Sequence, residues 1–106
     1  MKTHTDITDF FQSQHFKAMC QAYHVASCYA FGSFVRQELT PKSDIDLIVS
    51  FKPMDVLDYA DNYFDFRDEL VQALGRSIDL LEAKALKNPI LRKRIRQTQK
   101  LLYKEE

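Results

Sequence analysis

The chain of 106 residues is 45% hydrophobic and 28% charged, so we expect residues 1–106 to fold as one domain around a single modest core. Its 15 basic and 15 acidic residues cancel, which excludes a protein that attracts nucleic acid through overall charge. No apolar run approaches the ~18 residues of a membrane span, and Cys20 and Cys28 lack metal-ligand spacing, which favours reduced thiols and a cytoplasmic location.

The first quarter of the chain predicts one helix and one strand. Thr5 or Asp6 would cap a helix that runs towards Tyr23. The apolar residues of this helix fall near one stripe, which comprises Ile7, Phe10, Phe11, Ala18 and Ala22. The run 25–31 combines apolar and β-compatible residues, so it predicts the first strand.

The segment after this strand carries the first candidate for ligand binding. Gly32 ends the strand, and a short helix over residues 34–38 would follow. The unpaired backbone N–H groups of its first turn and the Ser33 hydroxyl would then face a bound anion. Residues 40–43 predict a turn, and residues 45–51 predict the second strand.

The second half of the chain predicts a helix, a strand and a final helix. Residues 55–74 form a helical pattern that Gly75 would end, and a short strand over 76–82 follows. Asn88-Pro89 would cap and open the last helix, which continues through Leu102. Together these elements indicate an α/β fold, with a small mixed sheet of about three strands flanked by helices.

Three aspartates lie within or beside the predicted strands. Asp44 and Asp46 are two residues apart, so their side chains project from the same face of an extended segment. Asp79 lies in the next strand, and it would join them if the two strands are neighbours in the sheet. Three carboxylates suit Mg²⁺, and two such ions about 3.5–4 Å apart would support in-line displacement at phosphorus.

The combined motif resembles the minimal nucleotidyltransferases of the DNA polymerase beta-like superfamily. More narrowly, it resembles the MNT antitoxins of HEPN/MNT toxin–antitoxin pairs. The residues that carry this resemblance are Gly32-Ser33-Phe-Val-Arg36, Ser43-Asp44-Ile-Asp46-Leu-Ile-Val and Ile78-Asp79-Leu-Leu. The resemblance covers nearly the whole chain, and it implies the polymerase beta-like nucleotidyltransferase fold.

The resemblance also implies roles for individual residues. Asp44 and Asp46 would bind two Mg²⁺ ions, and Asp79 would complete the metal site and act as base towards the acceptor hydroxyl. The phosphates of ATP would be held by Gly32 and Ser33, with Arg36, Lys42 and Ser43 beside them. For Arg36 and Lys42, a surface salt bridge is an equally good interpretation. Many relatives have Gly directly after the motif arginine, where this chain has Gln37, and this difference predicts a stiffer loop.

The function implied by the resemblance is transfer of AMP from ATP to a hydroxyl of a partner HEPN toxin, and the resemblance implies a tyrosine as the acceptor. Two other functions stay open: a non-catalytic antitoxin that neutralises its toxin by binding, and a small-molecule transferase of the aminoglycoside type. The basic final segment raises direct nucleic-acid binding, but it has no interleaved aromatic residues, so a solvated or partner-facing helix is favoured. The sequence leaves a homo-oligomer open and indicates no membrane association.

Overall fold

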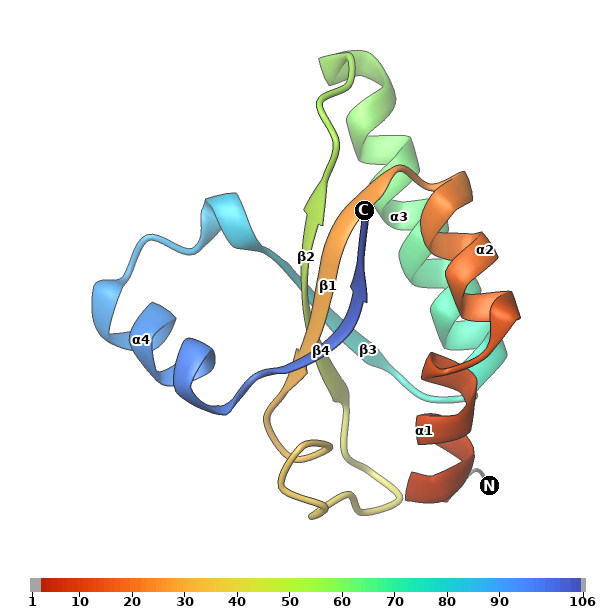
Figure 1. The fold of residues 1–106 in the computed structure, drawn as a ribbon, viewed down its shortest axis with the longest axis vertical. Coiled ribbons are helices and arrows are strands. Elements are labelled where there is room, and N and C mark those ends of the chain that lie inside the picture. The colour runs from red at the N-terminus through yellow and green to blue at the C-terminus, as the bar shows by residue number, and fades with distance from the viewer. Residues whose placement is uncertain (1–2, 106) are drawn as a thin grey trace.

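A computed structural model describes residues 3–105 and contains a four-stranded sheet in the order β3-β2-β1-β4 (Figure 1). The strands are β1 (Val25–Phe31), β2 (Ile45–Phe51), β3 (Ile78–Glu82) and β4 (Lys100–Lys104). β1 is antiparallel to both β2 and β4, whereas β2 and β3 are parallel. The predicted α/β fold with a small mixed sheet is therefore confirmed, with one strand more than the three expected.

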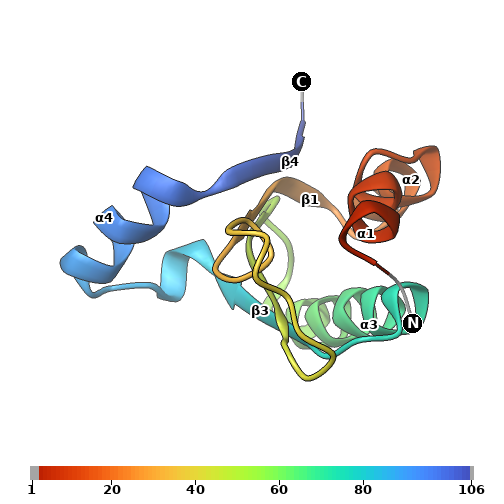
Figure 2. The same ribbon diagram turned by 90° about the horizontal axis from the view of Figure 1, so that it is seen from below.

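Three helices cover one face of the sheet, and the fourth lies on the opposite side (Figure 2). The first group is α1 (His4–Phe11), α2 (Gln14–Ala22) and α3 (Val56–Leu74), and the fourth helix is α4 (Pro89–Thr98). Ile45, Leu47 and Val49 of β2 are buried against the first group. The alternate residues of β2, among them Asp46 and Ile48, therefore face the side of α4.

The single N-terminal helix that the sequence predicted is in fact two helices. Thr3, rather than Thr5 or Asp6, caps α1 and forms a capping box with Asp6. A second cap follows at Ser13, whose hydroxyl accepts a hydrogen bond from the Phe16 amide. The break between the two helices also shifts the expected apolar stripe. Ala18 and Ala22 are exposed, and the buried residues of α2 are Phe16, Met19 and Cys20.

The predicted helix over residues 34–38 is absent, and a series of turns takes its place. The amide of Gln37 donates to the Phe34 carbonyl, and the amide of Glu38 donates to the Ser33 carbonyl. Gln37 has a left-handed backbone, with φ of 59°, which a regular right-handed helix excludes. This left-handed backbone favours glycine, so Gln37 lies where its side chain makes the loop conformation less favourable than a glycine would.

The last predicted helix is shorter than expected. Asn88 and Pro89 open α4 as predicted, since the Asn88 side chain accepts from two amides of the first turn. The helix ends at Thr98, however, and Gln99 adopts extended dihedrals. Residues 100–104 then pair with β1 as an edge strand. Leu102 packs partly against the core from this strand and not from a helix.

The long central helix and the third strand follow the prediction with small corrections. α3 ends at Gly75, whose φ of 63° gives the expected left-handed cap. β3 begins at Ile78 rather than at residue 76. Val56, the first residue of α3, is 85% exposed, whereas Phe66 in the second half of the helix is fully buried.

Candidate active site

The parallel pairing of β2 with β3 places two of the predicted catalytic aspartates side by side. Asp46 and Asp79 are direct partners in this register, and both project from the face of the sheet on which α4 lies. Asp44 lies just before β2 and is exposed. On the other side of β2, Asp46 pairs with Phe31, the last residue of β1. The strand order therefore brings the end of β1 and both carboxylates to one place.

Gly32 follows β1 directly and touches the carboxylate of Asp46. A Cβ atom at residue 32 would lie 2.2 Å from Asp46 Oδ2, which is far inside van der Waals contact. The backbone φ of 71° also lies in the left-handed region, where side chains are disfavoured. Glycine is thus required here for two reasons, and the first of them is specific to the Asp46 side chain.

The pKa of Asp46 is raised above its ordinary value. Burial of the carboxyl group is the main cause, followed by the negative charges of Asp79 and Asp44 and by hydrogen bonding with the Asp79 carboxyl. The guanidinium of Arg36 opposes this shift. Asp46 is therefore close enough to Asp79 and Asp44 to be repelled by both, and a bound cation would relieve that repulsion.

The aspartate oxygens suit a divalent ion that is coordinated by only a few protein ligands and binds water or substrate at its other positions. Within residues 3–105, no three acidic, histidine or cysteine side chains form a ready-made metal cage. Asp46 and Asp79 offer adjacent hard oxygen donors, and Asp44 adds a solvent-exposed one. Mg²⁺ commonly uses one or two carboxylates and completes its octahedron with water and substrate phosphates. The residues present therefore fit Mg²⁺ better than a closed structural metal site.

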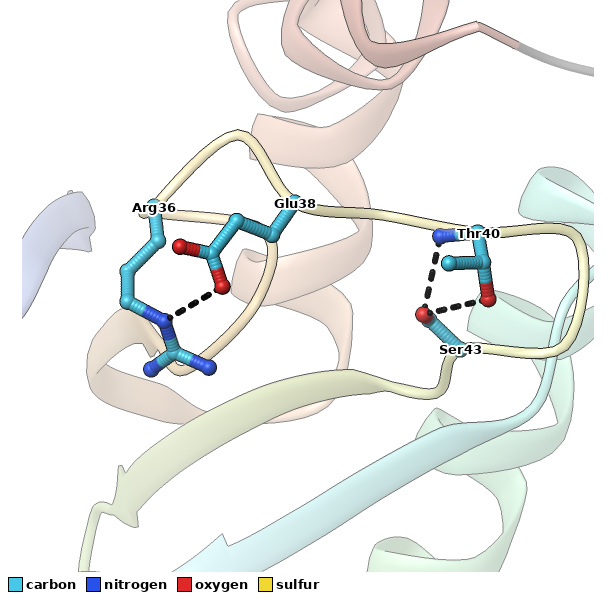
Figure 3. Close-up of polar contacts among 4 residues, drawn as sticks. All are labelled: Arg36, Glu38, Thr40 and Ser43. Atoms are coloured by element: carbon cyan, nitrogen blue, oxygen red, sulfur yellow. Dashed lines mark hydrogen bonds and ion pairs between the residues drawn. The ribbon is translucent and has the colours of Figure 1, made fainter.

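The segment between β1 and β2 forms two small braced loops (Figure 3). In the first loop, Arg36 Nε and Glu38 Oε2 form an exposed ion pair at 3.1 Å. In the second, the Ser43 hydroxyl accepts from the Thr40 amide at 2.9 Å and lies 3.0 Å from the Thr40 hydroxyl. Ser43 is therefore a brace of the loop that leads into Asp44. The structure gives Arg36 an alternative partner to phosphate.

The remaining residues predicted to hold the nucleotide, Lys42 and Ser33, differ in their exposure to solvent. Lys42 is exposed at the tip of the second loop, where its amide donates to the Thr40 hydroxyl at 3.3 Å. Ser33 is half-buried next to Gly32, in the first turn after β1. Because no helix follows, the predicted helix N-terminus is not available to bind an anion. A phosphate-binding role for Ser33 depends instead on its hydroxyl and on the turns around it.

Sequence reasoning missed the residues that anchor these loops from outside. The ring of His4 stacks on Phe34 with 4.7 Å between centroids, and His4 Nε2 donates to the Phe34 carbonyl at 3.1 Å. Arg76 Nη1 donates to the carbonyls of Thr40 at 2.7 Å and Ser43 at 3.0 Å. His4 lies thirty residues away in sequence from its partner, so no local pattern indicates either contact.

Comparisons with known proteins agree with this geometry. Residues 14–106 match the family model described as polymerase beta, nucleotidyltransferase. A protein of Methanocaldococcus jannaschii named "putative protein adenylyltransferase" is 40% identical over 95 residues, which cover 90% of this chain and 93% of that protein.

Solved structures with the same fold have lower sequence identity. One is described as a "putative minimal nucleotidyltransferase", with a TM-score of 0.78, 21% identity and coverage of 93% of this chain and 95% of that one. A toxin–antitoxin with AMP-PNP gives a TM-score of 0.65 at 19% identity, over 86% and 72% of the two chains. The tri-AMPylated HEPN toxin of Shewanella oneidensis in complex with an MNT antitoxin gives 0.57 at 18% identity, over 86% and 68%. At such identities, these likenesses establish the fold.

Proposed function

The chain belongs to the polymerase beta nucleotidyltransferase family, and we propose that it is a Mg²⁺-dependent protein adenylyltransferase. In this proposal it transfers AMP from ATP to a hydroxyl, in the first instance a tyrosine, of a HEPN-domain toxin, and so acts as the antitoxin of the pair. The observation that carries the proposal is the direct pairing of Asp46 with Asp79 beside Gly32. The names of the relatives supply the acceptor class and the nucleotide.

In this reaction the protein mainly positions the acceptor and the nucleotide, and it forms no covalent bond with either. The acceptor oxygen would form a bond to the α-phosphorus while the bond from that phosphorus to pyrophosphate breaks in line. Asp79 would accept the proton of the acceptor hydroxyl, since it lies at the edge of the sheet and is open to solvent. Gly32 and Ser33 would hold the phosphates, and Arg36 would leave Glu38 to add a positive charge.

Asp44 and Asp46 would hold Mg²⁺, with Asp79 completing the set. When bound, Mg²⁺ would neutralise phosphate oxygens and offset the repulsion among the three carboxylates. The pKa of Asp46 is raised mainly by burial of its carboxyl group and further by the negative charges of Asp79 and Asp44, and a bound cation would offset those charges. Lys42 and Ser43 belong to the proposal as neighbours of the nucleotide, Lys42 by its charge and Ser43 by bracing the loop.

Further expectations belong to the same proposal. Residues 1–106 would act as a single minimal domain, in the cytoplasm, where the buried thiols of Cys20 and Cys28 stay reduced. Among the helices in residues 3–105, none is long and apolar enough to cross a membrane. A homo-oligomer would be compatible with the reaction but is not required by it. The alternatives are an antitoxin that acts by contact alone and a transferase for small molecules.

Transfer of label from ATP tests the proposal. The protein would be incubated with Mg²⁺, ATP labelled at the α-phosphate and the HEPN toxin encoded beside it in its genome. We expect label on the toxin and loss of toxin activity, with both effects abolished in Asp46→Asn. The matched control is Asp61→Asn, which removes an exposed carboxylate of α3 and should transfer label normally.

The outcomes separate the candidate functions. A toxin that is inhibited equally by the protein and by Asp46→Asn, with no label on it, would replace the enzyme by an antitoxin that acts through contact. Label that appears on an aminoglycoside but never on protein would favour the small-molecule transferase. Calorimetry with MgATP adds an independent check, because Asp46→Asn should weaken nucleotide binding only when Mg²⁺ is present.

A further inference from the structure

A cavity of about 230 Å³ lies between the sheet and α4. Its floor is formed by Tyr29 of β1 and Ile48 of β2, and Ser50 lines it further along β2. Arg92 and Arg96 of α4 form part of the opposite wall. This space lies on the face of the sheet opposite to the large hydrophobic core, and none of the proposed catalytic residues lines it.

The cavity lies next to the Asp46 carboxylate along the strands of the sheet. Ile48 follows Asp46 by two residues on the same face of β2, which corresponds to about 6.6–6.8 Å along a strand. On the neighbouring strand, Tyr29 pairs with Ile48 just as Phe31 pairs with Asp46. A group seated above Tyr29 and Ile48 is therefore next to Asp46 along this face of the sheet.

The cavity and the phosphate loop lie on opposite sides of Asp46. Gly32 and Ser33 lie beyond the end of β1, whereas the cavity lies back along β1 and β2. In-line displacement places the attacking oxygen across the phosphorus from the leaving pyrophosphate. If pyrophosphate leaves towards Gly32 and Ser33, the acceptor must approach from the side of the cavity.

The size and lining of the cavity indicate what the acceptor side chain is. Its volume is below the range of about 300–1,000 Å³ that holds a drug-sized ligand, so it accommodates about one ring system. Tyr29 and Ile48 offer apolar and aromatic surface to such a ring, and a guanidinium of α4 would stack on its face. A serine or threonine acceptor would leave this space unfilled. A phenol fills it and still carries a hydroxyl towards Asp46.

The positive charge of the cavity wall indicates which residues flank the acceptor tyrosine in its own chain. Arg92 and Arg96 are one helical turn apart and exposed, and none of the acidic residues between positions 3 and 105 lines the cavity. Among the ion pairs within residues 3–105, none includes either arginine. These charges are therefore available to a ligand that brings its own carboxylates.

We propose that this cavity is the acceptor subsite, which takes the phenol side chain of a tyrosine flanked by acidic residues in the acceptor protein. The inference rests on the proposed function for the direction of the reaction. To the proposed function it adds the residues that select the acceptor, and the negative charge of the acceptor segment. Tyr29, Ile48, Arg92 and Arg96 bind and orient the acceptor in this assignment, and they take no part in the chemical step.

Binding of short peptides, followed by NMR on the isotope-labelled protein, tests this assignment without any need for catalysis. The probes are the capped peptides Asp-Asp-Tyr-Asp-Asp, Asp-Asp-Ser-Asp-Asp and Lys-Lys-Tyr-Lys-Lys. We expect the first to shift the amide signals of residues around Ile48 and Ile95, and the other two to bind more weakly. Absence of shifts at the cavity with the first peptide, or equal binding of all three, would overturn the proposal.

Variants of α4 sharpen the test. Arg92→Gln and Arg96→Gln should each raise the dissociation constant of the acidic tyrosine peptide about fivefold, which is the effect of losing one cation–π or charge contact. Arg94→Gln removes the same charge from an exposed residue that does not line the cavity, and it should bind normally. Ser50→Phe should fill the cavity and abolish peptide binding.

A parallel titration with MgATP distinguishes this inference from the proposed function. MgATP should shift signals near Gly32 and Asp46, and its affinity should be unchanged in Arg96→Gln. If Arg96→Gln weakens MgATP as much as it weakens the peptide, the arginine serves the nucleotide and the acceptor subsite is refuted. If the wild-type protein binds the peptide but not MgATP, the proposed function fails, while the cavity remains an acidic-tyrosine site.

Discussion

The substitution Gly32→Ala should displace the Asp46 carboxylate while it lowers the stability of the fold only slightly. The added Cβ would lie 2.2 Å from Asp46 Oδ2, with Asp46 Cγ at 3.1 Å and Cβ at 3.3 Å. The backbone belongs to a turn that is tied to the strand end, so the side chain of Asp46 must give way. It has to move by more than about 1 Å to restore an ordinary contact of 3.4 Å.

Two magnitudes follow from this geometry. A left-handed residue with a side chain costs about 1–2 kcal/mol, and the smaller entropy of the unfolded alanine chain returns part of it. The net loss is about 1 kcal/mol, which lowers the melting temperature of a domain of this size by about 4–8 °C. A displacement of 1 Å at reacting groups costs about 100-fold in rate. Gly32→Ala should therefore lose far more activity than stability.

Gly75→Ala is the matched control for this experiment. Gly75 has nearly the same backbone, with φ of 63°, but nothing lies within 4 Å of the position of its added Cβ. Thermal denaturation should show similar losses for the two variants, while transfer of labelled AMP should fall about 100-fold only in Gly32→Ala. Equal transfer rates in the two variants would refute the assignment of Asp46 to the reacting centre.

Three further substitutions test other parts of the site. Asp46→Asn should melt at a higher temperature than the wild type at pH 7, because the folded protein raises the pKa of Asp46 and so disfavours its ionised form. The wild type loses stability relative to the variant as the pH rises from 3.8 through that raised pKa. In a pH series of thermal melts, the difference in melting temperature should therefore vanish below pH 3.8. Gln37→Gly should relieve a left-handed residue and stabilise the protein by about 0.5–1 kcal/mol in urea denaturation, and a loss of stability would contradict the strain argument. His4→Ala removes the stacking and hydrogen bond to Phe34, so calorimetry should show weaker MgATP binding, whereas the exposed neighbour variant Thr5→Ala should bind MgATP as the wild type does.

The parts of the fold that sequence reasoning predicted correctly are those with local causes. The strands 25–31 and 45–51 are bounded by turn-forming residues, and their bounds match the structure. Gly75 and Asn88 mark helix ends through their own backbone or side-chain hydrogen bonding, which depends on near neighbours alone. The pairing of Asp46 with Asp79 was predicted only conditionally, because it depends on which strands are neighbours.

The parts that were missed depend on contacts between distant segments. Residues 100–104 continue a helical pattern, yet they form β4 because the edge of β1 offers hydrogen-bonding partners that the sequence alone does not display. The turns after Gly32 replace a predicted helix in a segment that His4 holds from thirty residues away. Neither feature has a local pattern, so propensity and periodicity favoured the wrong element in both cases.

The site divides into a part fixed by the sheet and a part held by loops. Asp46 and Asp79 owe their proximity to the register of β2 with β3, and a slip of β3 by one residue would send Asp79 to the opposite face from Asp46. Ser33 and Arg36 lie in turns braced by a few hydrogen bonds and one exposed ion pair. Residues on rigid strands are placed more accurately than residues on loops. Substitutions in the strand pair should therefore alter the rate of transfer, whereas substitutions in the turns should alter mainly the affinity for nucleotide.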